Sequence, residues 1–152
     1  MKGPMMHRTG TAFSAPIGLT LAGLAGPAMA QNEDKMIKID VTIGTETLSA
    51  TLDDTPAGCD FASMLPLDIT PDDYHGIEKV GDLGRQIDNA GAPRAYEPKA
   101  GDITQYRPWS NLAIFLKPFQ SSAGLVRIGE FDGPIDALSR AGEIPVRITL
   151  AD

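Results

Sequence analysis

Two alternating segments near opposite ends of the chain constrain its fold more than any other feature. Apolar residues occupy every second position in most of residues 36–43 and again in residues 144–150. Because successive side chains of a β-strand point to opposite faces, this spacing predicts two strands that each bury one face. Residues 46–52 alternate in the same way and follow the first segment across Gly44-Thr45, so these two segments are expected to form a β-hairpin.

The chain between these segments is divided into short pieces. Its 152 residues include 16 glycines and 12 prolines, a content that favours many short strands over a few long helices. Gly129 can allow a bend in the last of the inner strands. Loops are expected at residues 70–76, 88–99 and 119–124. The inner strands are predicted at residues 67–69, 77–80, 103–106, 112–116 and 125–131.

Two short helices are expected beside the strands. Thr55 or Asp54 can cap a helix that has Pro56 at its first position, and Pro66 would end it. Residues 134–138 could form the second helix. If the first strand pairs with the last, the sheet has no free edge. We therefore predict an all-β fold, a closed eight-stranded β-barrel with one or two short capping helices.

The first 30 residues match a secretory signal peptide. Lys2 and Arg8 give a positive start, residues 11–26 are small, apolar and uncharged, and Ala28-Met29-Ala30 resembles a cleavage site. The alternative is a membrane anchor, but the apolar stretch is shorter than the roughly 20 residues of a spanning helix. The expected organisation is a signal peptide at 1–30, a flexible leader at 31–35 and a folded domain at 36–151. The expected location is periplasmic or secreted, without membrane insertion after cleavage.

The net charge of the chain restricts the classes of macromolecule that it is expected to bind. Cleavage would remove two of the 13 basic residues and none of the 20 acidic ones, so the net charge would fall from −7 to −9. Nucleic acids and anionic membranes need a basic surface, so neither is an expected partner. Solubility alone would also favour such a charge.

Cysteine and metal chemistry find little support in the sequence. The single cysteine, Cys59, cannot form an internal disulfide, and a buried structural thiol is favoured over a reactive one. A catalytic cysteine would need a histidine partner, and nothing ties His75 to Cys59. Asp72 and Asp73 stand near His75, but their spacing matches no metal motif. No metal and no other cofactor is expected.

Five segments in order resemble the cyclophilin-like domain family of small bacterial and archaeal proteins. The resemblance covers nearly all of residues 36–150, although the family usually carries glycine in place of Ser110. It implies a closed eight-stranded barrel with short capping helices. It does not imply prolyl isomerase activity, because true cyclophilins carry a Phe-His-Arg segment that this chain lacks, and fold alone does not grant function. The matching segments are residues 36–39 with the following hairpin, 60–67, 73–79, 108–115 and 124–129.

Residues around the only tryptophan form the candidate binding site. Trp109 lies close to Tyr106 and Asn111, directly before an apolar strand. Aromatic rings with polar tips beside an amide are typical of a pocket rim, and Arg85 is a possible charged contact. The alternatives are that Trp109 packs in the core while Asn111 satisfies a turn, and that Arg85 covers apolar surface with its stem.

Two functions follow from this site. The first is an exported binding module for a peptide or a small molecule, without the usual prolyl isomerase active site. The second is a periplasmic peptidyl-prolyl cis-trans isomerase, in which Arg85 or Arg107 would polarise the imide. A guanidinium facing an open apolar groove would favour the isomerase. A tryptophan buried under other side chains would weaken both hypotheses.

Overall fold

The structure is a computed structural model that describes residues 3, 10, 18, 23 and 36–152. The predicted signal peptide and leader therefore lie outside the described residues, apart from four glycines. Within the described part of the chain, no helix has the length and hydropathy needed to cross a membrane.

The folded part is mostly β-structure. Eleven strands, one α-helix and two 3-10 helices are found in residues 36–152. Their bounds in chain order are β1 (Ile37–Ile43), β2 (Glu46–Leu52), α1 (Pro56–Ser63), β3 (Leu67–Ile69), β4 (Asp72–Tyr74), β5 (Glu78–Asp82), β6 (Ala95–Tyr96), β7 (Asp102–Tyr106), η1 (Arg107–Trp109), β8 (Asn111–Phe115), β9 (Ser122–Ala123), β10 (Leu125–Phe131), η2 (Asp136–Leu138) and β11 (Val146–Leu150).

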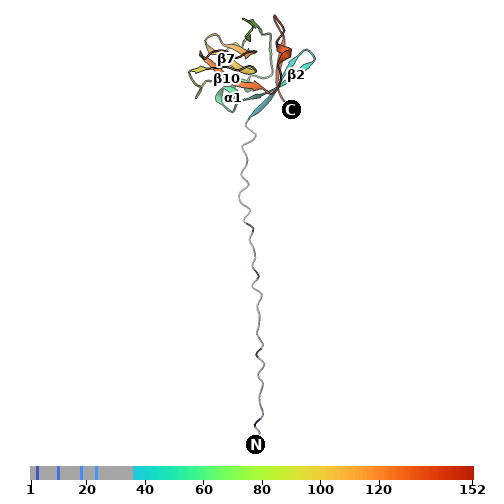
Figure 1. Cartoon of the computed structure of the whole chain (residues 1–152), viewed down its shortest axis with the longest axis vertical. Coiled ribbons are helices and arrows are strands. Elements are labelled where there is room, and N and C mark those ends of the chain that lie inside the picture. The colour runs from blue at the N-terminus through green and yellow to red at the C-terminus, as the bar shows by residue number, and fades with distance from the viewer. Residues whose placement is uncertain (1–2, 4–9, 11–17, 19–22, 24–35) are drawn as a thin grey trace. The chain divides into compact units, whose positions relative to one another are not determined.

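Nine of these strands form one antiparallel sheet. Their order is β3-β11-β1-β2-β10-β7-β8-β5-β4, and β6 pairs with β9 in a separate ribbon. β1 lies between β2 and β11, so the predicted hairpin and the predicted pairing of the first strand with the last are both confirmed. The sheet curls around the main core, with α1 against it (Figure 1).

The prediction of a closed eight-stranded barrel is wrong, although the all-β class is confirmed. The sheet is an open half-barrel of nine strands, and its two end strands, β3 and β4, do not pair with each other. They follow one another in the chain across Thr70 and Pro71. Pro71 has no amide hydrogen for a ladder, and its carbonyl instead accepts a hydrogen bond from the Ile144 amide at 3.0 Å.

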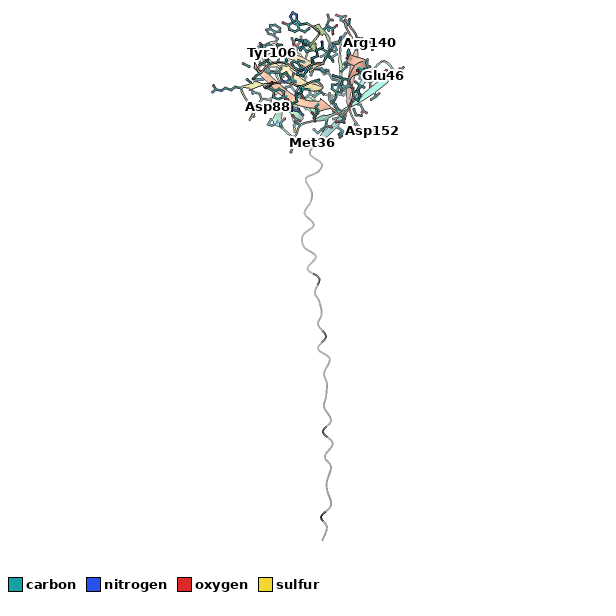
Figure 2. The ribbon with its side chains drawn as sticks, viewed as in Figure 1. Met36, Glu46, Asp88, Tyr106, Arg140 and Asp152 are labelled. Atoms are coloured by element: carbon teal, nitrogen blue, oxygen red, sulfur yellow. The ribbon has the colours of Figure 1, made fainter. Side chains whose placement is uncertain are left out.

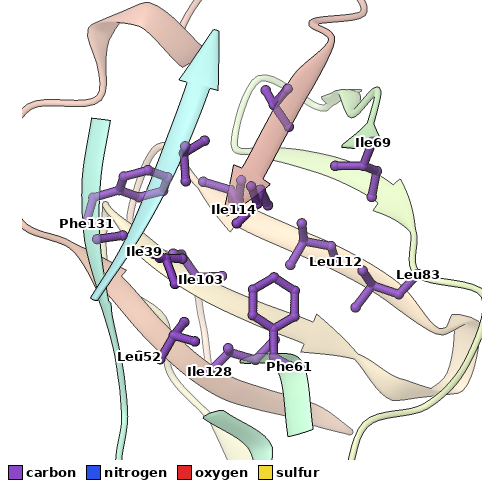
Figure 3. Close-up of a cluster of buried hydrophobic side chains, with 14 of the residues drawn as sticks. Ile39, Leu52, Phe61, Ile69, Leu83, Ile103, Leu112, Ile114, Ile128 and Phe131 are labelled. Atoms are coloured by element: carbon purple, nitrogen blue, oxygen red, sulfur yellow. The ribbon is translucent and has the colours of Figure 1, made fainter. Parts of the chain in front are cut away.

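The helix α1 forms where the sequence predicts it and fills the core. The Thr55 hydroxyl accepts a hydrogen bond from the Gly58 amide at 3.1 Å, and Pro56 opens the helix. Phe61 is fully buried, and its ring points from α1 toward Leu112 (Figure 3). Burial of such a side chain contributes on the order of 2 kcal/mol to folding.

The strand β10 bends where glycine was expected to allow it. Its register against β7 shifts between Arg127 and Gly129. A Cβ atom on Gly129 would lie 2.3 Å from the Thr51 carbonyl oxygen, so only glycine permits this approach of β10 to β2. The bulge breaks simple alternation, and Ile128 and Phe131 both reach the main core.

The strand β8 is buried on both faces, and this creates a second apolar cluster outside the main core. Leu112 and Ile114 belong to the main core. Ala113 and Phe115 point to the other face, where they pack with Leu125 of β10. This second face of the sheet carries the candidate site.

Candidate functional site

A groove of about 510 Å³ lies over the second apolar cluster, on the face of the sheet opposite the main core. Strands β5, β7, β8 and β10 contribute its floor, while β4, η1 and the segment before β10 contribute its sides. The lining residues are Tyr74, Glu78, Val80, Tyr106, Trp109, Asn111, Ala113, Phe115, Phe119, Gln120, Ser121, Ser122, Ala123 and Leu125.

Exposed aromatic side chains gather at this groove. Trp109 is 61% exposed, Tyr74 43% and Phe119 39%. They are three of the five large apolar side chains that are exposed within residues 36–152. The ring of Tyr106 meets Trp109 edge to face, with centroids 5.3 Å apart. Trp109 therefore stands at the rim of a groove, and the alternative in which it packs in the core is wrong.

Tyr106 and Asn111 are neighbours in the sheet. They pair across β7 and β8 directly beside η1, which holds Trp109. The structure thus brings three of the four predicted site residues to one groove. The three residues are close because a tight turn joins the two strands. Their short separation in the sequence was therefore enough to predict that they lie together.

Arg85, the fourth predicted residue, does not line the groove. Its guanidinium donates two hydrogen bonds of 2.8 Å to the carboxylate of Asp60 on α1. These bonds lower the pKa of Asp60 from 3.8 to about 2. The sequence could not show this pairing, because the two residues are 25 positions apart.

Arg107 is also engaged away from the groove. Its guanidinium donates to the carbonyl oxygen of Ile87 at 3.3 Å and to the side-chain oxygen of Gln86 at 3.1 Å. Neither of the two arginines considered for an isomerase site is among the residues that line the groove.

Glu78 is a charged type of residue in the groove lining that sequence reasoning missed. It stands on β5 opposite Phe115 of β8 and is half-buried. Burial raises the pKa of its carboxyl group. Within residues 36–152, no ion pair or hydrogen bond of this carboxylate is found. In the sequence, a single glutamate in a short strand is typical of a solvent-facing position. Its place in the groove became visible only in the structure, where neighbouring segments cover this face of the sheet.

The wall of the groove is held in place by a small ribbon. Residues 88–99 and 119–124 were predicted to be loops, but β6 and β9 within them pair with each other. The Phe119 amide donates to the Pro98 carbonyl at 3.2 Å. The Gly124 amide donates to the Arg94 carbonyl at 3.1 Å. The groove therefore has a defined wall rather than a free loop.

A smaller apolar pocket adjoins the groove. It has a volume of about 210 Å³ and shares Tyr74, Glu78, Phe115 and Phe119 with it, while His75 adds its ring. The turn at residues 75–76 separates β4 from β5, and β4 itself falls in a segment predicted to be a loop. The two pockets together give Glu78 an apolar surrounding on more than one side.

Cys59 departs from its predicted environment. The thiol is exposed on α1 rather than buried. In the part of the chain that the structure describes, no cluster of three or more histidine, cysteine or acidic side chains is arranged to hold a metal ion.

Comparison with known proteins gives a family and a fold. The pattern of a family described as the cyclophilin-like family matches residues 41–149. The fold is similar to the solution structure of a hypothetical protein from Archaeoglobus fulgidus, with a TM-score of 0.58 and 13% sequence identity over 80% of this chain and 99% of that chain. At this identity the likeness is one of fold alone. No curated protein matches the chain.

Proposed function

The chain belongs to the cyclophilin-like family, and we propose that within this fold it acts as a binding module for a small molecule or a peptide segment. The gathering of exposed Tyr74, Trp109 and Phe119 around one groove is the observation that carries the proposal. Exposed apolar side chains that cluster are typical of binding sites, whereas isolated ones are common on any surface. The groove volume of about 510 Å³ falls within the range of about 300–1,000 Å³ of small-molecule sites.

The fold supports a groove that exists before a ligand arrives. The floor is a β-sheet that also carries the main core on its other face. The wall is hydrogen-bonded to a second segment. A preformed site loses less conformational entropy on binding, which favours affinity.

Prolyl isomerisation has less support. The reaction needs an apolar proline pocket and a cation near the imide, against a barrier of about 20 kcal/mol. Arg85 and Arg107 bind groups outside the groove. An isomerisation assay on the purified protein is therefore expected to show only the uncatalysed rate, and acceleration that depends on groove residues would favour the isomerase instead.

We propose export on the basis of residues 1–30 alone. Their charge, apolar stretch and Ala28-Met29-Ala30 site support cleavage before Gln31. The expected location of the mature domain is the periplasm or the medium. Mass spectrometry of the protein recovered from a periplasmic fraction would show a chain beginning at Gln31, and a full-length chain in the cytoplasm would contradict the proposal.

Binding is tested with the neutral fluorescent probe N-phenyl-1-naphthylamine, whose emission rises in an apolar site. The double variant Trp109→Ala with Phe119→Ala should bind the probe about thirtyfold more weakly, because each of the two truncated aromatic anchors costs on the order of 1 kcal/mol. Both side chains are exposed, so the fold should survive.

The matched control is Leu150→Ala, which removes an exposed apolar side chain that does not line the groove. Its affinity for the probe should equal that of the wild type. Equal affinity of all three proteins, or no binding by the wild type, would contradict the proposed function.

A further inference from the structure

A purely apolar ligand would give the Glu78 carboxylate no hydrogen-bond partner and would strip it of more of its hydration. This side chain lies on the groove floor opposite Phe115. A carboxylate in an apolar surrounding without a partner costs free energy. An apolar residue at this position would serve the fold better, so the benefit of Glu78 is to be sought in what enters the groove.

The charge of the groove is negative and uncompensated. Glu78 is the one aspartate or glutamate among the described lining residues, and these include no lysine or arginine. The adjacent Lys79 points to the other face of β5. It is fully buried, its ammonium pairs with Asp73 at 2.6 Å, and it donates to the Gly142 carbonyl at 2.9 Å. The lysine next to Glu78 in the sequence is therefore paired with other groups and does not neutralise Glu78.

Five aromatic rings line the groove that holds this carboxylate. Tyr74, Tyr106, Trp109, Phe115 and Phe119 all line the groove. The face of an aromatic ring attracts an organic cation within about 6 Å, and tryptophan does so most strongly. A groove that combines a carboxylate with such rings complements a ligand that joins a positive charge to an apolar body.

We infer that the groove selects an organic ammonium cation with an apolar body, which Glu78 pairs by its carboxylate and the aromatic rim covers. This inference rests on the proposed binding function and names the ligand class of the same site. An anion would be repelled by Glu78. A neutral ligand would desolvate the carboxylate without replacing its hydration. The acidic balance of the chain, −7 overall, also favours the approach of cations.

The inference is tested by titration calorimetry with three water-soluble probes of similar size that differ in charge. They are benzylammonium, benzyl alcohol and benzoate. The wild-type protein should bind benzylammonium about tenfold more tightly than benzyl alcohol, the effect of one hydrogen bond to a charged group. Benzoate should bind most weakly.

The variant Glu78→Gln removes the charge and keeps the shape of the side chain. Its affinity for benzylammonium should fall to that of benzyl alcohol, while its affinity for benzyl alcohol should stay or improve. Glu46→Gln makes the same change on β2, and Glu46 does not line the groove and lies across the domain from Tyr106 (Figure 2). It should keep the wild-type preference, which separates local pairing from the general effect of net charge.

The outcomes distinguish the two proposals. If the wild type binds benzyl alcohol as tightly as benzylammonium, or if Glu78→Gln keeps the preference, the cation inference is wrong and the binding function stands. If N-phenyl-1-naphthylamine binds but none of the three benzyl probes does, the cation inference is again wrong. If no probe binds at all, both proposals fail.

Discussion

At the scale of single residues, Ser110 shows how one backbone conformation shapes the groove. Its φ of 56° and ψ of 26° lie in the left-handed region, which costs a residue with a Cβ atom about 1–2 kcal/mol. The Ser110 amide donates to the Arg107 carbonyl at 3.0 Å and its carbonyl accepts from Leu83 at 3.0 Å. This turn ends η1 and begins β8, so it positions Trp109 and Asn111 at the rim.

The variant Ser110→Gly should therefore be more stable than the wild type. Glycine adopts the left-handed region without a steric penalty, and we expect a gain of about 1 kcal/mol in the free energy of unfolding. Urea denaturation followed by Trp109 fluorescence measures it. Ser139→Gly is the control, because Ser139 also ends a 3-10 helix but has a φ of −79°. A gain of the same size at both positions would show that strain at Ser110 is not the cause.

At the scale of elements, Lys79 links the two sides of the open half-barrel. Its buried ammonium donates to the carbonyls of Arg140 and Gly142, at 2.5 and 2.9 Å, and pairs with Asp73 on β4. Asp73 in turn accepts a hydrogen bond from the Gly142 amide at 2.8 Å. All three protons of the ammonium are engaged. The end strand β4 is thus joined to the segment before β11, and β11 is the sheet neighbour of the other end strand, β3.

Replacing Lys79 by methionine should destabilise the protein by about 3 kcal/mol, because the loss of one partner leaves buried polar groups unpaired. Amide hydrogen exchange should also become faster in the segment that precedes β11. Chemical denaturation and exchange at Gly142 measure the two effects.

The matched control is Arg147→Met, which breaks an ion pair with Asp68 in which both side chains are more than half exposed. Exposed pairs contribute about 0–1 kcal/mol, so this variant should stay near the wild type. Comparable losses in the two variants would refute the role given to Lys79.

At the scale of the whole molecule, carboxylates that bind distant segments set the response to acid. The hydrogen bonds from Arg85 lower the pKa of Asp60 to about 2. Hydrogen bonding also lowers the pKa of Asp73, chiefly through Lys79, and of Asp132, chiefly through Thr51. A carboxyl group with a lowered pKa in the folded state stabilises the fold above its unfolded pKa, and this stabilisation is lost as the pH falls.

We therefore expect the urea midpoint to decrease as the pH falls from about 4 toward 2. Glu78 acts in the opposite sense, since burial raises its pKa and its protonation relieves a cost. Asp60→Asn should make the loss of unfolding free energy in acid smaller. The difference should be less than about 1 kcal/mol, because the Asp60–Arg85 pair lies near the surface. Arg85→Met should reduce this loss to a similar extent. A midpoint that is constant or rises over this range would contradict the prediction.

Features that depend on neighbouring residues could be predicted from the amino-acid sequence. Alternation placed β1, β2 and β11, because a strand that buries one face must repeat its apolar residues with a period of two. Thr55 or Asp54, followed by Pro56, marked the start of α1, and in the structure the Thr55 side chain is the cap, accepting a hydrogen bond from the Gly58 amide. Tyr106, Trp109 and Asn111 could be grouped because a single short turn holds them together.

The pairing of charged side chains, in contrast, became visible in the folded structure. Glu78 and Lys79 are adjacent in β5, yet the lysine is buried and the glutamate faces the groove. Lys79 can be buried because Arg140 and Gly142, 61 and 63 residues away, supply its partners. Arg85 likewise leaves the groove for Asp60. Such pairings join residues that are far apart in the sequence, so the spacing of neighbouring residues does not predict them. The same reason applies to the missing ladder between β3 and β4.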